Sequence, residues 1–306
     1  MATKPFEKIG IIGFGEVGGI FGRDLVQRGI EVSTFDILFD QPDSRQAMLA
    51  KARDCGIRTC ESAGDCLRGR ELIISAVTAS SAGHVAEECA PMLAGGQVFL
   101  DINSVSPETK SRMAGDFSRR QGHFVEAAVM AAVAPQRLKV PMLLGGQFAK
   151  ELVPRLAAIG MNAKAVSEKV GVASAVKMCR SVIIKGLEAL VVESMFAARR
   201  YGAEEAVLAS LAATYPEMGW QAELPDYLIG RVAQHGRRRA AEMREASQAV
   251  KDVGIDPHMA RATAARQDWL AEKIAAHGLQ NCAGKDFSWR ALADALAEAS
   301  QSGKPR

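Results

Sequence analysis

Residues 9–36 read IGIIGFGEVGGIFGRDLVQRGIEVSTFD, and they indicate the architecture of the first half of the chain. The apolar run at residues 9–12 predicts a buried strand, and an apolar stripe of helical period predicts the helix that follows it. Gly29 ends that helix, and residues 31–35 predict a second strand that closes at Asp36. The predicted order is therefore strand, glycine turn, helix, strand and acid.

The glycine turn has the spacing G-x-G-x-x-G, which is typical of dinucleotide binding when a strand precedes it and a helix follows. The first glycine permits a sharp turn, the second lets a pyrophosphate approach the backbone, and the third lets the helix pack close to the strand. The helix start offers free N–H groups and partial positive charge to the phosphates. An acid about 20 positions later binds ribose hydroxyls, so Asp36 favours NAD over NADP. The predicted cofactor-binding residues here are Gly13, Phe14, Gly15, Glu16, Val17, Gly18 and Asp36. A glycine-rich turn that holds no ligand is the alternative.

The composition is that of an ordinary globular protein, with 306 residues, 48% hydrophobic and 24% charged. This length suggests two domains. A net charge of +3 is too small to indicate nucleic-acid binding. The chain has no signal-peptide pattern and no apolar run long enough to span a bilayer. The six cysteines form no metal-binding pattern with histidines, so we predict no metal site. Scattered thiols suit a reducing compartment, and we expect a cytoplasmic protein without membrane partners.

Strand and helix patterns alternate up to about residue 166, which predicts a doubly wound parallel sheet. We predict strands at 72–77, 98–101, 124–129 and 142–144, helices at 44–54, 82–93, 107–121 and 148–159, and a loop at 78–81. Ligands bind at the carboxyl ends of such strands. These ends are the loops at Gly13, Thr78, Asn103 and Ala128, and they add Val77, Thr78, Asn103 and Ser104 to the predicted cofactor-binding residues.

The second half is predicted to be entirely helical, with helices at 173–200, 204–214, 225–253, 257–277 and 288–300. We therefore expect a dinucleotide-binding domain at 1–166 and an all-helical domain for substrate binding and dimerisation at 167–306. The long helix at 173–200 joins them and carries an apolar stripe formed by Val176, Ile183, Leu187, Leu190, Val191 and Met195. Apolar surface of that extent seldom stays exposed on a monomer, so we expect a homodimer through the helical domain.

Lys177 and Ser181 lie four positions apart on the long helix and share one face. Lys177 comes early in this helix, which begins where the dinucleotide-binding domain ends, so its side chain can point toward the cofactor. A lysine in a helix is usually solvated, and that is the alternative for Lys177. Its position near the junction of the two predicted domains favours a functional role instead.

These motifs together resemble the β-hydroxyacid dehydrogenase family, which includes 3-hydroxyisobutyrate, tartronate semialdehyde and 6-phosphogluconate dehydrogenases. The resemblance covers the whole chain and implies a Rossmann-type α/β domain followed by an all-α domain. The segments that carry it are GFGEVG at 13–18, DINS at 101–104 followed by Pro107, EAAVMAA at 126–132, GVASAVKMCRS at 171–181, and the dipeptide Lys251-Asp252. It implies that Ser104 lies near the nicotinamide and the substrate, and that Lys177 is the catalytic lysine with Ser181 beside it.

Two departures from the family pattern concern the substrate. Ser181 stands where the family has asparagine, and MAA at 130–132 replaces the S-G-G of the substrate loop. The resemblance places Ser104, Val129, Met130 and Ala131 at the substrate. An anionic substrate group needs another partner, and the HGRRR stretch offers His235 and Arg237, with the two arginines that follow. A solvated helix face is the alternative for these cations.

The implied function is hydride transfer between NAD and the alcohol carbon of a small hydroxyacid-like substrate, with Lys177 as general acid and base. Two alternatives stay open. One is an imine reductase, which shares the architecture and would tolerate the Met130 loop. The other is a protein that binds the nucleotide without catalysis.

Overall fold

The computed structural model describes residues 4–118, 122–280 and 287–302. The chain divides into two compact units, Met1–Lys177 and Met178–Arg306, which we call the nucleotide unit and the helical unit. Helix α8, Val172–Tyr201, runs through the division. The predicted domain boundary at 166 and 167 falls at the end of strand β8 (Ala163–Ser167), and it stays a prediction.

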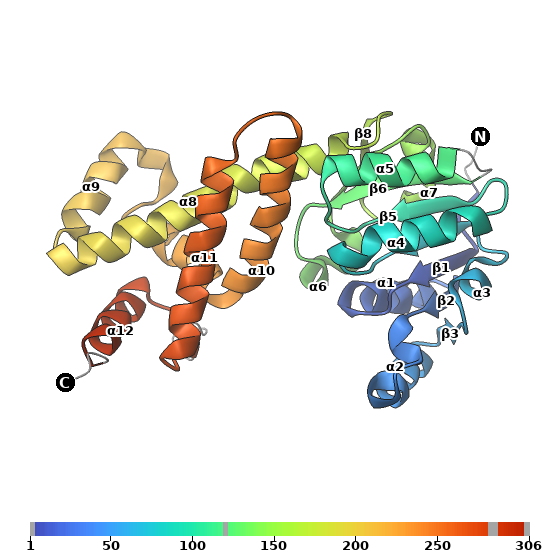
Figure 1. Ribbon diagram of the computed structural model, residues 1–306, viewed down its shortest axis with the longest axis horizontal. Coiled ribbons are helices and arrows are strands. Elements are labelled where there is room, and N and C mark those ends of the chain that lie inside the picture. Colours follow the sequence, from blue (N-terminus) through green and yellow to red (C-terminus); the bar gives the residue numbers. More distant parts are fainter. Residues whose placement is uncertain (1–3, 119–121, 281–286, 303–306) are drawn as a thin grey trace. The chain divides into compact units, whose positions relative to one another are not determined.

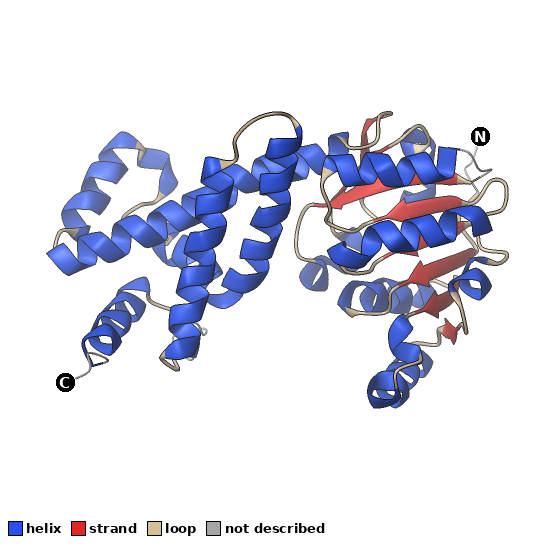
Figure 2. Cartoon of the chain, viewed as in Figure 1, coloured by secondary structure: helices blue, strands red, loops and turns tan. Residues whose placement is uncertain are grey.

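The nucleotide unit is built on a sheet with the strand order β3-β2-β1-β4-β5-β6-β7-β8 (Figures 1 and 2). Its strands are β1 Lys8–Ile12, β2 Glu31–Phe35, β3 Arg58–Thr59, β4 Leu72–Ser75, β5 Val98–Asp101, β6 His123–Val129, β7 Met142–Gly145 and β8 Ala163–Ser167. The α-helices before α8 are α1 Glu16–Gln27, α2 Pro42–Asp54, α3 Ala63–Leu67, α4 Ala79–Cys89, α5 Pro107–Ser118, α6 Val133–Gln136 and α7 Ala149–Ala158. Short 3₁₀ turns occur at η1 Ile37–Phe39, η2 Ala90–Met92 and η3 Arg137–Lys139. This is the predicted doubly wound α/β architecture.

The central strands are buried on both faces, as their uninterrupted apolar sequences predict. In β4, Leu72 and Ile74 pack into a core cluster with residues of α1, α2 and α7. Ile73, which points to the opposite face, packs into a second cluster with residues of α3, α4 and α5. Helices therefore cover both faces of the sheet, and the strand ends are left as the place where a ligand can bind.

Strand β7 departs from the prediction of a wholly parallel sheet, because it runs antiparallel to β6. The connection between these two strands holds only the four-residue α6 and the turn η3, and lacks the full crossover helix that a parallel return uses. The predicted loop at 78–81 is also wrong in part, since α4 begins at Ala79 and Thr78 is its N-cap residue. Threonine and serine favour helix N-caps as well as turns, so a Thr78 that predicts a loop can also begin a helix.

The helical unit contains the remainder of α8 with α9 Glu204–Thr214, α10 Leu224–Asp252, α11 His258–Ala276 and α12 Trp289–Ser302, and a short turn η4 at Pro216–Met218. Its main core includes Val192 of α8, Ile229 of α10, Leu270 of α11 and Trp289 of α12. The predicted helices are confirmed, with one correction. The backbone of α10 is non-helical at His235 (φ −133°, ψ 15°), so this element is bent.

The bend lies beside a close approach of two helices within the helical unit. A Cβ atom on Gly236 would lie 2.8 Å from the carbonyl oxygen of Gln267 in α11, so only glycine fits there without a shift. None of the described helices is apolar over a stretch long enough to cross a membrane.

Candidate cofactor and active site

The glycine turn between β1 and α1 fits the pyrophosphate of a dinucleotide. Gly13 has φ +95°, and a Cβ on it would clash with the carbonyl oxygen of Ala76. A Cβ on Gly18 would clash with the carbonyl oxygen of Gly13, so the helix packs against the turn as the motif requires. Gly15 is different, because no atom of the described chain lies within 4 Å of a Cβ placed there. Open space beside its backbone is what an approaching phosphate needs.

The start of α1 is the second element of this site. The helix begins at Glu16, and among the residues that the structure describes no side chain caps it. The first N–H groups of a helix have no intrahelical partner, and they carry partial positive charge. This end of α1 can therefore donate hydrogen bonds to phosphate oxygens, as the sequence predicted for residues 16–18.

Asp36 lies at the carboxyl end of β2, where its carboxylate is tied to the glycine turn. Its Oδ2 accepts a hydrogen bond of 2.6 Å from Phe14 N, and its Oδ1 accepts one of 2.9 Å from Leu38 N. These two bonds orient the carboxylate and leave lone pairs on both oxygens for ribose hydroxyls.

Lys51 of α2 also belongs to this candidate site, although no sequence pattern pointed to it. Its Nζ donates hydrogen bonds of 2.8 Å to the carbonyl oxygens of Phe14 and Gly15, and it lies 4.6 Å from the centre of the Phe14 ring. A lysine in a polar helix 36 positions after Gly15 has no recognisable motif spacing. The folded chain nevertheless places its positive charge at the glycine turn.

The neighbouring strand β4 ends beside the same turn. A Cβ on Gly13 would lie 2.9 Å from Cγ1 of Val77, so this half-buried valine borders the turn. Thr78 is exposed, and its Oγ1 lies within hydrogen-bond distance of the hydroxyls of Ser80 and Ser81.

Ser104 and Lys177 are brought into contact in the nucleotide unit. The Nζ of Lys177 donates a hydrogen bond of 2.5 Å to Oγ of Ser104, and both side chains are partly buried. Seventy-three positions separate the two residues in sequence. A primary amine and a hydroxyl held in this way form the kind of pair from which a proton can be exchanged with a bound alcohol.

A buried polar network supports the segment that carries Ser104. Asn103 donates from Nδ2 to Oγ of Ser75 at 2.9 Å and also to Asp101. Asp101 forms an ion pair with Lys110 of α5, and both of these side chains are fully buried. The amide of Asn103 is thus engaged in the interior, and its predicted role at the cofactor would have to come from its backbone.

Glu126 of β6 forms a second buried network at the first turn of α8. Its Oε1 accepts hydrogen bonds from Gly171 N at 2.6 Å and Ala173 N at 3.1 Å. Its Oε2 accepts from Ser174 N at 3.3 Å and Ser174 Oγ at 2.6 Å. The sequence identified this residue only as the start of a substrate-loop motif, and no local signal connected it with α8.

The predicted substrate loop follows β6. Val129 and Met130 are half-buried, Ala131 is exposed, and Met130 N donates to the carbonyl oxygen of Pro141 at 2.9 Å. The loop therefore offers a thioether and small apolar side chains at the carboxyl end of β6.

The remaining predicted residues, catalytic Ser181 and the substrate-binding His235 and Arg237, belong to the helical unit. Ser181 Oγ accepts a hydrogen bond of 3.3 Å from Nζ of Lys185, a buried lysine that also pairs with Glu242 at 2.7 Å. Burial lowers the pKa of Lys185, and the negative charge of Glu242 opposes that shift. The sequence did not single out Lys185, because a lysine in a helix is usually solvated.

His235 lies at the bend of α10, where partial burial and the positive charge of Arg238 lower its pKa. Arg237 is exposed. Arg239, which the sequence included among possible anion partners, is buried and donates from Nε to Glu188 at 2.8 Å. Its guanidinium is therefore engaged in an internal ion pair and is not placed to bind a substrate.

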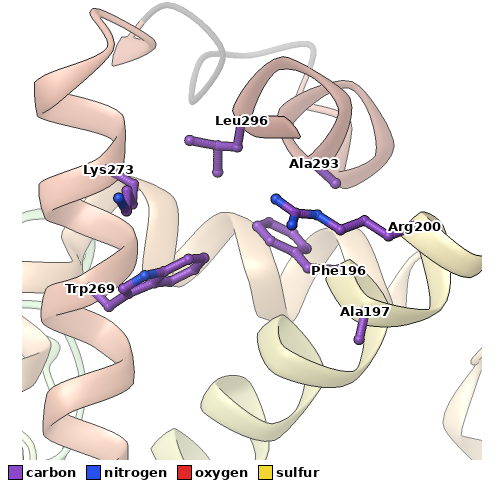
Figure 3. A pocket seen from close by; sticks show the side chains of 7 residues that line it. All are labelled: Phe196, Ala197, Arg200, Trp269, Lys273, Ala293 and Leu296. Carbon is purple, nitrogen blue, oxygen red and sulfur yellow. The ribbon is translucent and has the colours of Figure 1, made fainter. Parts of the chain in front are cut away.

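The helical unit contains a cavity of about 240 Å³. Figure 3 shows the side chains that line it. Phe196 and Trp269 form its aromatic side, with ring centres 6.5 Å apart, and Arg200 and Lys273 add positive charge. None of the residues that line it is among the predicted site residues.

Comparison with known proteins supports the nucleotide-binding assignment. Residues 8–167 match the family model described as the NAD binding domain of 6-phosphogluconate dehydrogenase, and residues 198–270 match a domain of unknown function. The structure of a conserved hypothetical protein from Sinorhizobium meliloti 1021 is 34% identical, with a TM-score of 0.85 over 97% of this chain and 98% of that one. The conserved protein MTH1747, described as structurally similar to 3-hydroxyacid dehydrogenases, is 32% identical, with a TM-score of 0.73 over 90% of this chain and 99% of that one.

More distant relatives carry assigned activities. The 3-hydroxyisobutyrate dehydrogenase of Pseudomonas aeruginosa is 24% identical over 213 residues, which are 66% of this chain and 68% of that protein. An imine reductase from Bacillus cereus shares the fold, with 14% identity and a TM-score of 0.58 over 97% of this chain and 99% of that one. Because the NAD-binding model spans more than half of the chain, the protein belongs to the 6-phosphogluconate dehydrogenase-like family of NAD(P)-binding, hydroxyacid dehydrogenase-like proteins.

Proposed function

We propose that the protein is an NAD-dependent oxidoreductase that acts on the alcohol carbon of a small hydroxyacid-like substrate, with Lys177 as general acid and base. The observation that carries the proposal is the hydrogen bond of 2.5 Å from Nζ of Lys177 to Oγ of Ser104. Membership of a family of NAD(P)-binding dehydrogenase-like proteins supports the reaction class, and this contact supports the assignment of the residues that handle the proton.

The chain's own residues divide the work between binding and proton transfer. The glycine turn, the start of α1 and Asp36 would hold the dinucleotide, whose nicotinamide accepts or donates the hydride when bound. Neutral Lys177 would take the proton of the substrate hydroxyl on oxidation, and protonated Lys177 would return it on reduction. Ser104 accepts a hydrogen bond from the amine and so holds Nζ in one position. Ser181, four residues further along α8, would add a hydroxyl near the substrate.

Other residues would bind the rest of the substrate. Ser104, Val129, Met130 and Ala131 lie on segments at the carboxyl ends of β5 and β6, where ligands bind in sheets of this kind. His235 and Arg237 would supply partners for an anionic group, since a guanidinium can bind a carboxylate through two hydrogen bonds.

A panel of alcohols, aldehydes and cyclic imines, followed by nicotinamide absorbance with NAD and NADP, tests the proposed function. Turnover of a hydroxyacid or its aldehyde supports it. Turnover of imines alone would assign an imine reductase, which the shared fold and the altered Met130 loop also allow. Cofactor binding in calorimetry without turnover of any compound would favour a nucleotide-sensing protein.

We expect NAD to bind more tightly than NADP because of Asp36. A second negative charge near contact distance costs about 1–4 kcal/mol, depending on the effective dielectric constant. The exposed Ile37 that follows cannot pair with a 2′-phosphate. Titration calorimetry should therefore give at least about tenfold tighter binding of NAD, and Asp36→Ser should narrow the difference. Equal affinity of the native protein for both cofactors would contradict the assignment of Asp36.

We also expect a homodimer formed through α8. Part of its apolar stripe packs inside the helical unit, where Val191 and Met195 are buried. Ile183 and Leu190 instead have 71% and 55% of their surface exposed. Light scattering at micromolar concentration should give a dimeric mass, and the double substitution of Ile183 and Leu190 by Asp should give a monomer.

The matched control for that experiment is Ser194→Asp, which adds a charge at an exposed polar position of the same helix. It should leave the dimer intact. A monomeric mass for the native protein would remove the proposed role of the stripe.

A further inference from the structure

We propose that Glu126 is the positioning residue for Lys177, acting through the first turn of α8. The proposal rests on the function assigned to Lys177 above, and it concerns how that side chain is held in place. Glu126 accepts hydrogen bonds from the first turn of α8, so its influence on Lys177 passes through the backbone of the helix.

The free N–H groups at the start of a helix need partners, and an anion is their best one. For α8 that anion is a carboxylate from the interior of the sheet. Glu126 is fully buried, and its two oxygens accept three backbone hydrogen bonds and one hydroxyl hydrogen bond from residues 171–174. Four bonds to one rigid group fix both the axial position and the rotation of this turn. Lys177 follows Ala173 by four positions, so its direction is set by the same turn.

The sheet fixes Glu126 in turn. Its Cα pairs with Cα of Asp101 in the parallel register of β5 and β6. Asp101 supports the segment that carries Ser104, as described above. Two buried carboxylates on neighbouring strands thus hold the two partners of one hydrogen bond: Asp101 holds the Ser104 side, and Glu126 holds the Lys177 side.

The strand β7 leaves room for this carboxylate. A Cβ on Gly145 would clash with Oε1 of Glu126, although the backbone there does not require glycine. Gly145 is also the register partner of Glu126 across β6 and β7. Gly145→Ala should therefore displace the carboxylate while leaving Glu126 itself unchanged, and it gives a second way to disturb the same contact.

The test measures the exposure of the Lys177 amine and does not depend on a known substrate. Acetic anhydride labelling, read by mass spectrometry, gives the reaction rate of each lysine. Glu126→Gln and Gly145→Ala should each raise the labelling rate of Lys177 by roughly fivefold, which is the effect expected when one hydrogen bond is lost. The reference variant Ser104→Ala, which removes the hydrogen-bond partner of Lys177, should give an increase of the same size. Glu126→Asp combined with Gly145→Ala should restore part of the native rate, because the shorter side chain makes room for the added methyl group.

The matched control is Glu71→Gln. Glu71 also accepts backbone hydrogen bonds, from Glu7 N at 2.8 Å and Lys8 N at 3.3 Å, but it is not tied to α8. The Glu71→Gln variant should leave the labelling rate of Lys177 unchanged even if it lowers the melting temperature. If Glu126→Gln does not fold, the variant Ser174→Ala takes its place in the comparison, because it removes one hydrogen-bond donor to Glu126. An unchanged labelling rate at Lys177 in the folded Glu126 or Ser174 variant and in Gly145→Ala would overturn the proposal.

Once a substrate is known, kinetics add a second readout. Glu126→Gln should lower kcat by roughly tenfold to a hundredfold through misplacement of the amine, with little change in KM or in the affinity for NAD. Failure of the proposed function would look different. In that case Lys177→Ala would retain turnover, while the labelling result for Glu126 would stand.

Discussion

Replacing Lys177 by alanine is expected to lower turnover by roughly 10²–10⁴-fold, the usual contribution of a positioned acid or base. The loss should fall on kcat, because proton transfer stabilises the transition state and not the bound substrate. NAD affinity should stay near the native value, since the carboxylate of Asp36 is oriented by the backbone N–H groups of Phe14 and Leu38. Steady-state kinetics and calorimetry on the same preparation check both parts.

Ser181→Ala is the comparison for that variant. It removes one neutral hydroxyl, which is worth about 1 kcal/mol, or roughly a fivefold effect. A Lys177→Ala protein with near-native turnover would remove Lys177 from the mechanism and leave only the nucleotide-binding assignment.

Replacing Lys110 by methionine is expected to destabilise the nucleotide unit by about 3–5 kcal/mol. Lys110 and Asp101 are both fully buried, and Nζ of Lys110 donates to the side chain and to the carbonyl oxygen of Asp101, the latter at 3.0 Å. Removing the cation leaves a carboxylate in the interior without its partner, and that charge has no access to water. Urea denaturation followed by circular dichroism measures the change in the midpoint and in the free energy of unfolding.

Two controls show whether the buried charge is responsible. The double variant Lys110→Met and Asp101→Asn removes both charges and should recover part of the stability. Lys150→Met breaks an exposed pair with Glu168 and should leave the transition nearly unchanged. A midpoint for Lys110→Met equal to that of Lys150→Met would refute the account of the pair.

The local sequence was sufficient to predict the backbone elements of the candidate cofactor site, although it did not point to Lys51. The strand, the glycine turn, α1, β2 and Asp36 all fall within residues 9–36, and the boundaries of β2, β5 and α9 agree with those predicted. Each of these features depends on short-range chemistry, such as the absence of a Cβ at Gly13 or an apolar run bounded by turn residues. The long helices of the second half were predictable for the same reason, because proline and glycine mark their ends.

Contacts between distant segments could not be predicted in this way. Lys51 reaches Phe14 across 37 positions, Glu126 reaches α8 across 45 to 48, and Lys177 reaches Ser104 across 73. A single sequence carries no periodic or spacing signal for such pairs, because their distance depends on how the sheet orders its strands. Only the packed fold decided the antiparallel direction of β7, the burial of Arg239 against Glu188, and the position of the Glu126 carboxylate at the start of α8. For the two polar contacts the reason is that a buried polar group needs a hydrogen-bond partner, and the tertiary structure determines which partner lies within reach.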